Sequence, residues 1–143
     1  MPLLVGSCVV VCTLLIHALA LNATVMFLRY EKQNGRVAVN FWTDVAIVAR
    51  AMSIAIVAHL IEIALWAVLF ITCREFPDFG TAYYHSAVNY TTLGYGDLIM
   101  TPSWKLLGPL EAAAGMLMFG FSTAMLFAVI QRLIETRYAD LRS

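Results

Sequence analysis

Three long apolar segments constrain this chain more than any other feature of its sequence. Residues 2–28 contain no charged side chain, and two further apolar runs cover about 51–73 and 103–131. At about 1.5 Å per residue, each run forms a helix long enough to cross the ~30 Å hydrocarbon core of a bilayer. Hydrophobic residues make up 62% of the chain and charged residues 13%, and a soluble domain of this size cannot bury so much apolar surface. The sequence therefore predicts an all-α membrane protein with three transmembrane helices.

The first two spans are separated by a more polar region, residues 29–50. It opens with "RYEKQNGR", which carries a turn signal at its Asn-Gly pair, and continues as a mixed polar and apolar stretch. This stretch fits either the membrane surface or an inward extension of the next helix. We therefore divide this part of the chain into an N-terminal transmembrane helix (1–28) and a cytoplasmic loop with an interfacial segment (29–50).

The distribution of basic residues predicts the orientation in the membrane, because cytoplasmic loops carry an excess of lysine and arginine. Basic residues gather in the loop after the first span and in the tail, residues 132–143. The segment between the second and third spans holds only Arg74 and Lys105. We expect the N-terminus outside and a short cytoplasmic tail. The compact chain, in which we see no cleaved signal peptide, fits a prokaryotic inner (plasma) membrane.

Composition and spacing argue against several other functions. The net charge is zero, which argues against nucleic acid, because its binding needs a basic patch. His59 and Glu62 supply two metal ligands with no third in view, and we expect them to pair with each other, with Arg50 of a neighbour, or with the first span. Ser122 and His59 are the only candidates for the nucleophile and base of a hydrolase, and nothing in the sequence orients them towards each other. We therefore expect no enzyme.

Between the second and third spans lies a segment that is too short to cross the membrane and too apolar for a free loop. The stretch "REFPDFG" (74–80) breaks the second helix. Residues 79–91 then predict a short re-entrant helix with Asp78 or Thr81 as its N-cap. The C-terminal end of this helix carries a negative partial charge into the membrane, which favours a cation.

The stretch "TTLGYGD" (91–97) follows this helix and is too rich in glycine to serve stability alone. Successive carbonyls can point the same way only if alternate residues take positive φ, which Gly94 and Gly96 do at little cost. The expected result is a ladder of carbonyls, together with the Thr92 hydroxyl, that replaces the water around a dehydrated cation. One chain supplies one wall of such a ladder, so we expect a homo-oligomer.

This stretch resembles the filter signature of the potassium-channel family, with leucine where valine or isoleucine is commoner. The resemblance covers roughly residues 51–131 and implies a homotetramer in the lipid bilayer. It implies a pore domain made of an outer helix (51–73), a pore helix (79–91), a filter (92–96) and an inner helix (103–131). It further implies that K⁺ is the permeant ion, that no cofactor is needed, and that the filter comprises Thr92, Leu93, Gly94, Tyr95 and Gly96, with K⁺ at the first four.

Other residues are expected to support this filter. Asp97 would brace it from behind, and Glu111 would reach the pore helix near Asn89 or Tyr90 as a hydrogen-bonded strut, or would act in gating through its protonation. Tyr83, Tyr84 and Tyr90 are expected to form an aromatic cuff. His85 occupies a position where the family usually has an aromatic residue, as a neutral packed histidine or as a proton sensor. The expected filter-supporting residues are Thr91, Asp97, Glu111, Asn89, Tyr84 and His85.

The inner helix carries the candidate hinge and gate. Gly115 matches a position where inner helices of this family often bend, although close helix packing explains it as well, and Gly120 is a second such residue. Phe119, Thr123 and Phe127 repeat every four residues and share one helix face. The resemblance implies that this face lines a water-filled cavity, with Phe127 either gating it or packing between subunits.

The chain departs from the minimal two-span architecture by its first helix, which we expect to face lipid and protein. It has no regularly spaced arginine helix, so no voltage sensor of the usual kind is expected. The preferred function is a potassium-selective channel that conducts passively. The alternatives are a weakly selective cation channel and a non-conducting, K⁺-binding membrane sensor or scaffold.

Overall fold

The computed structural model describes residues 1–37 and 39–138, and these residues form helices joined by turns and loops. In chain order the helices are α1 (Pro2–Gln33), α2 (Phe41–Thr72), α3 (Phe79–Tyr90) and α4 (Leu107–Arg137). Three of them, α1, α2 and α4, are long and apolar enough to cross a membrane. The predicted all-α architecture with three such helices is therefore confirmed. Of the predicted tail, residues 139–143 lie outside the described part of the chain.

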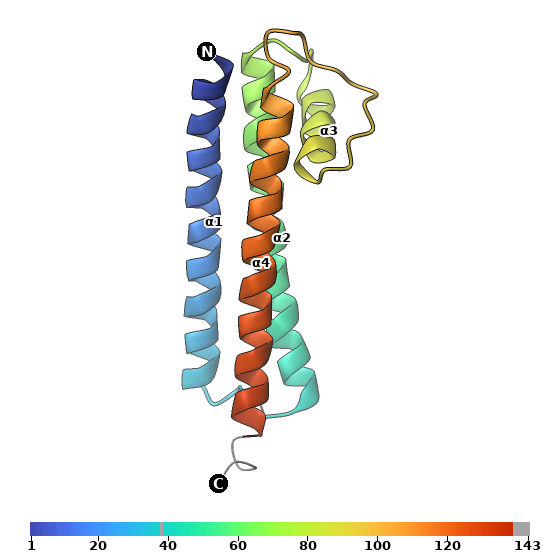
Figure 1. The fold of residues 1–143 in the computed structure, drawn as a ribbon. Helices are drawn as coiled ribbons and strands as arrows, with labels where there is room; N and C mark the ends of the chain where they lie inside the picture. The colour runs from blue at the N-terminus through green and yellow to red at the C-terminus, as the bar shows by residue number, and fades with distance from the viewer. Residues whose placement is uncertain (38, 139–143) are drawn as a thin grey trace.

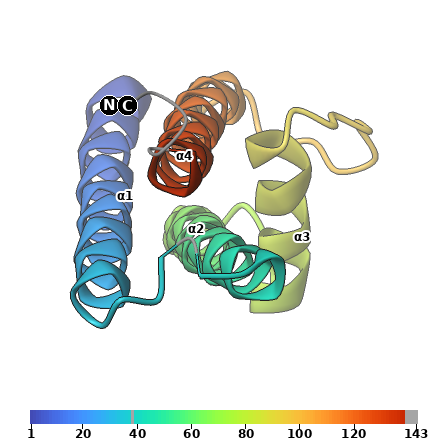
Figure 2. The ribbon, with the colours of Figure 1, turned by 90° about the horizontal axis from the view of Figure 1, so that it is seen from below.

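The long helices form an elongated bundle, and the short α3 lies beside one end of it (Figure 1). Seen along the bundle, α1 and α3 lie on opposite sides of the α2–α4 pair (Figure 2). The N-terminus and the loop after α3 are at the same end of the bundle, and the C-terminal end of α4 is at the other (Figure 1). The loop that carries "TTLGYGD" thus lies on the side of the molecule that α1 does not cover.

The second helix begins at Phe41 and not near residue 51, so the predicted boundary of the interfacial segment was wrong. The physical reason is a helix cap: Asn40 is extended, and its side chain accepts a hydrogen bond from the Thr43 amide at 2.8 Å. Residues 41–50 therefore extend the second span, as the alternative interpretation proposed. In the same way α1 continues past residue 28 to Gln33.

The fourth helix begins at Leu107, a few residues later than the predicted 103. Residues 101–106 form turns instead, and Thr101 is held by the Glu75 carboxylate. The Thr101 amide and hydroxyl donate to the two Glu75 carboxylate oxygens, each at 2.6 Å. These two hydrogen bonds connect the residues just after α2 to the loop before α4.

A carboxylate sets the start of α3. Asp78 is extended and accepts hydrogen bonds from the Thr81 amide at 2.9 Å and the Thr81 hydroxyl at 2.7 Å. These hydrogen bonds to Thr81 hold the pKa of the Asp78 carboxyl below its ordinary value. Of the two predicted caps, Asp78 is the cap and Thr81 is its donor.

Ion pairs connect the three long helices at the end of the bundle that is remote from α3. Glu31 on α1 is buried, and its carboxylate lies 3.3 Å from Arg50 on α2 and 3.9 Å from Arg36. Arg137 on α4 pairs with Asp44 on α2. Within the chain, Glu31 is thus the carboxylate that pairs with Arg50, and a pairing of Glu62 with Arg50 of a neighbouring chain stays a prediction.

Candidate functional site

The loop after α3 has an alternating backbone. Thr92, Gly94 and Gly96 have φ angles of 61°, 62° and 72°. A non-glycine residue at positive φ costs roughly 1 kcal/mol or more, so the surrounding structure must hold Thr92 in place. Two hydrogen bonds to the last turn of α3 do so: the Thr92 amide donates to Asn89 O at 2.8 Å and the Gly94 amide to Val88 O at 3.2 Å. The alternation expected at the glycines thus extends to Thr92, the first residue of the expected filter.

The side chains of this loop are open in a single chain. Leu93 is 55% exposed and Tyr95 68% exposed. Two large apolar side chains on this short loop are therefore only partly covered by their own chain and remain open to a contact outside it.

Asp97 is connected to α3 by one of the expected supporting residues. The Tyr84 hydroxyl donates to Asp97 Oδ2 at 2.9 Å. The hydrogen bond spans the end of the loop and the middle of α3. It therefore fixes the separation between the far end of the loop and the helix that precedes it.

His85 is packed between aromatic rings. Its ring centroid lies 4.6 Å from that of Phe76 and 5.4 Å from that of Phe70. Its Nε2 lies 2.9 Å from the Asn89 amide nitrogen, which can only donate, so Nε2 accepts. A ring whose Nε2 accepts is neutral, and this geometry supports the packed-histidine interpretation.

Tyr90, the last residue of α3, does not belong to a cuff with Tyr83 and Tyr84. Its side chain is fully buried and points into the interior of the subunit. Its backbone lies directly against α4, because a Cβ built on Gly115 would stand 2.1 Å from the Tyr90 carbonyl oxygen. Close approach of α3 therefore explains the glycine, and α4 continues as a regular helix through Gly115 and Gly120. The hinge at either glycine stays a prediction.

Glu111 reaches α3 from α4 and is fully buried. Its Oε1 lies 2.5 Å from the Ser86 hydroxyl oxygen, and Asn89 also hydrogen-bonds to it. Asn89 was an expected partner of Glu111, and Ser86 was not. The Ser86 hydroxyl also lies 2.8 Å from Ile63 O, and its single hydrogen cannot serve both contacts. A protonated Glu111 resolves this, because its own O–H then donates to Ser86.

The predicted cavity face of α4 is only partly open. Phe127 is 68% exposed, and the exposed Thr123 bonds its hydroxyl to Phe119 O at 2.8 Å. The Phe119 ring packs towards the interior, with its centroid 4.3 Å from the His59 ring and 5.6 Å from the Tyr90 ring. Phe119 therefore connects this face of α4 to the interior of the subunit.

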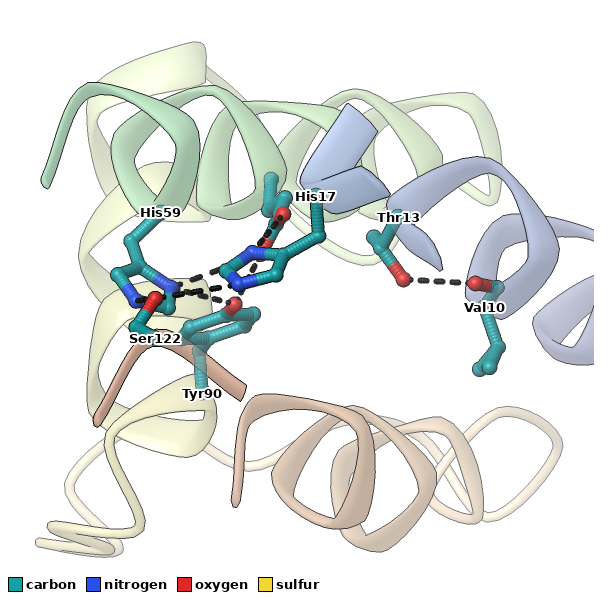
Figure 3. Close-up of polar contacts among 7 residues, drawn as sticks. Val10, Thr13, His17, His59, Tyr90 and Ser122 are labelled. Atoms are coloured by element: carbon teal, nitrogen blue, oxygen red, sulfur yellow. Dashed lines mark hydrogen bonds and ion pairs between the residues drawn. The ribbon is translucent and has the colours of Figure 1, made fainter. Parts of the chain in front are cut away.

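The interior there holds five polar side chains, which we call the buried polar cluster: His17, His59, Glu62, Tyr90 and Ser122. All of them except Glu62 are labelled in Figure 3. Each is at most 7% exposed. His17 Nδ1 lies 3.0 Å from Glu62 Oε1, His59 Nδ1 lies 3.0 Å from the Tyr90 hydroxyl, and that hydroxyl donates to Glu62 Oε2. Ser122 Oγ lies 3.1 Å from the Nε2 atoms of both histidines. The cluster connects α1, α2, α3 and α4 at one point.

This cluster corrects one expectation and confirms another. Nothing in the sequence placed Ser122 near His59, yet their side chains are in hydrogen-bond contact. Glu62 does pair with the first span, through His17, which the sequence analysis did not single out. One signal could have found it. His17 is the only histidine in residues 2–28, a predicted span that contains no charged residue.

The contacts of Ser122 with His59 and of His59 with Glu62 resemble those of a hydrolase triad. These side chains lie in a closed interior. His59 Nδ1 is 3.6 Å from Glu62 Oε2. The cavity that borders Ser122 and His17 measures about 10 Å³, which is room for about one water molecule and none for a substrate. The cavity therefore leaves no room for a substrate beside Ser122.

Together these features define a class: a multi-pass membrane protein in which a short helix ends in a loop of alternating φ beside a long helix. The family model described as "Ion channel" matches residues 56–132, which is more than half of the chain and runs from within α2 to α4. The chain belongs to this ion channel family, whose potassium-channel domains have two membrane spans. No curated protein and no solved structure matches the chain. The matched region leaves out α1, the helix that contributes His17.

Proposed function

We propose that the chain is a potassium-selective channel that conducts K⁺ passively through a homotetrameric pore. The observation that carries the proposal is the alternation of positive φ at Thr92, Gly94 and Gly96, in a chain of the ion channel family. Backbone carbonyls that face one side can replace the hydration shell of K⁺. A simple glycine turn between two helices would need no such alternation.

The short helix α3 supports a cation at the same place. Its C-terminal end leads directly into Thr91 and Thr92, so its negative dipole end faces the start of the filter. Its N-terminal end is capped by the Asp78 carboxylate. The polarity of α3 thus favours a cation at the base of the filter.

The family and the exposure of the loop side chains support a fourfold assembly. Four loops per pore form the filter of potassium channels. In a tetramer the exposed Leu93 and Tyr95 side chains would be covered by neighbouring subunits, as a closed ring requires. We further propose that the N-terminus and filter face outward and that the C-terminus faces the cytoplasm of a prokaryotic cell, because basic residues gather at the C-terminal end.

The test is the reversal potential of the purified protein in a planar bilayer with potassium on one side and sodium on the other. We expect a value near the potassium equilibrium potential. Currents that reverse near zero would contradict selectivity and favour the weakly selective cation channel. No current, with intact tetramers, would contradict conduction and favour the sensor or scaffold.

A substitution connects the measurement to the filter backbone. Gly96→Ala places a side chain at a φ of 72°, where it is strained. We expect lower selectivity or loss of current in this variant. Leu4→Ala, on an exposed part of α1, is the control and should conduct as the unmodified chain does.

A further inference from the structure

The buried polar cluster contains a set of metal ligands that the ion channel fold does not explain. One ligand atom from each of His17, His59 and Glu62 lies within 4.8 Å of the other two, and all three residues are buried. The sequence shows only two ligands close together, His59 and Glu62, and α1 supplies the third, His17. We propose that the buried polar cluster binds one divalent transition metal ion of the Zn²⁺ type. This site is separate from the K⁺ filter and does not depend on selectivity.

The spacing of the donor atoms fits such an ion. With bonds of about 2.0–2.2 Å, the ligand atoms of a tetrahedral Zn²⁺ site lie roughly 3.4 Å apart. Glu62 faces each histidine with one carboxylate oxygen: Oε1 lies 3.0 Å from His17 Nδ1, and Oε2 lies 3.6 Å from His59 Nδ1. The Tyr90 hydroxyl lies 3.0 Å from His59 Nδ1 and also contacts Glu62 Oε2. It therefore lies beside two of the three ligand residues.

The second nitrogen of each histidine is also placed as a metal site requires. A histidine that binds a metal donates its other ring N–H to a nearby acceptor, which orients the ring. The Nε2 atoms of His17 and His59 both lie 3.1 Å from Ser122 Oγ. A serine oxygen has two lone pairs and accepts both hydrogens. Ser122 would thus orient both ligands at once.

Neutral side chains alone do not complete the hydrogen bonds of the cluster, so either a metal ion or a bound proton is needed. Without an ion, five contacts within the cluster need five hydrogens. Two neutral histidines, Ser122 and Tyr90 supply one each, and an ionised Glu62 supplies none. One contact is therefore left without a donor. With an ion, the Nδ1 atoms and Glu62 bind the metal, the two Nε2–H groups donate to Ser122, and no contact is left over.

The charge of Glu62 also favours a bound metal ion. Glu62 is fully buried near the middle of α2, and an uncompensated carboxylate inside a membrane is costly. In the described residues, the ion pairs of Glu62 are with the two histidines alone. Neutral histidines supply no positive charge to balance it, and a divalent cation would. It would also fasten α1 to α2 and to Tyr90, the residue directly before the "TTLGYGD" stretch.

The test measures metal bound to the full-length chain in detergent. Cys8, Cys12 and Cys73 are changed to serine, so that no thiol competes for the metal; all three are free, and the first two are exposed. The protein is loaded with Zn²⁺, desalted, and analysed by mass spectrometry of the elements. We expect about one Zn²⁺ for each chain, and at least a tenfold loss in His17→Gln and Glu62→Gln. Ser122→Ala should bind the metal about 10–100-fold more weakly.

The chain provides a matched control. Its three histidines are His17, His59 and His85, and His85 lies among Phe70, Phe76 and Asn89, outside the cluster. His85→Gln should retain the metal. Equal Zn²⁺ in His17→Gln and in the cysteine-free chain would overturn the proposal.

A second measurement covers the case in which His17→Gln does not fold. Co²⁺ replaces Zn²⁺ in tetrahedral sites and gives visible absorption that depends on its geometry. We expect the cysteine-free chain to show tetrahedral Co²⁺ absorption that added Zn²⁺ abolishes. If this chain binds neither ion, the proposal is wrong, and a bound proton supplies the fifth hydrogen instead.

Discussion

The carbonyl oxygen of Tyr90 lies against Gly115, at a place where a Cβ would be only 2.1 Å away. Tyr90 is thus held from two sides, by α4 at its backbone and by the buried polar cluster at its hydroxyl. The two residues that follow it, Thr91 and Thr92, begin the loop with alternating φ. The position of this loop therefore depends on contacts made one residue before it.

Gly115→Ala should push the end of α3 away from α4. Because backbone and not a flexible side chain is in the way, we expect a loss of about 1–3 kcal/mol in stability and weaker K⁺ selectivity. Thermal unfolding of the assembled protein and the reversal potential measure the two effects. Gly120→Ala is the matched control, since a Cβ there meets nothing within 4 Å. Equal unfolding temperatures for both variants would show that the close approach is unimportant.

Glu111→Gln should be tolerated, whereas Glu111→Ala should not. The glutamine amide can donate to Ser86 Oγ as a protonated carboxyl does. Alanine removes that contact and leaves a cavity, at a cost of about 2 kcal/mol or more. The thermal stability of the assembly in detergent compares the two. A glutamine variant as unstable as the alanine variant would mean that an ionised carboxylate is required.

Tyr84→Phe removes the hydroxyl that holds Asp97. The expected cost is about 0.5–1.5 kcal/mol for one hydrogen bond, located at the far end of the loop. We expect conducting events to become shorter in single-channel recordings. Tyr83→Phe, whose ring packs on Phe79, should conduct normally, and identical records for the two variants would argue against this role of Asp97.

Acid should weaken the start of α3. The pKa of Asp78 is lower in the folded protein than its ordinary value of 3.8, because the Thr81 amide and hydroxyl bond to the carboxylate. The stability from this cap is therefore fully present above pH 3.8 and is lost as the pH falls through the lower, folded-state pKa. Asp78→Asn keeps a cap without titrating. Its unfolding temperature should depend less on pH in this acid range, and an unchanged pH dependence would contradict the prediction.

The sequence predicted the elements of this protein better than their contacts. Runs of apolar residues specify the three spans, and Asp78 with the glycine-rich stretch places α3 and the loop. The start of α2 was missed because residues 41–50 mix polar and apolar side chains, and hydropathy gives their Asn40 cap no weight. A helix cap is a local signal, and Asn40 could have been used to predict the start of α2.

The buried polar cluster could not be predicted in the same way. His17 and Glu62 are far apart in the chain, and their contact depends on how α1 is rotated against α2. The contacts of Ser122 with both histidines depend likewise on how α4 is placed against α1 and α2. Helix rotation and separation arise from packing over the whole bundle, and short sequence patterns carry little information on either.

The place of α1 opposite the loop has a consequence for an assembled channel. If four loops meet at a central axis, α1 lies at the perimeter, where lipid touches it before it touches any other helix (Figure 2). A change in bilayer thickness or lateral tension would then act first on α1. His17 would carry that displacement inward to Glu62 and Tyr90. The outermost helix of the assembly, α1, would thus be mechanically connected to Tyr90, the residue directly before the narrowest part of the pore.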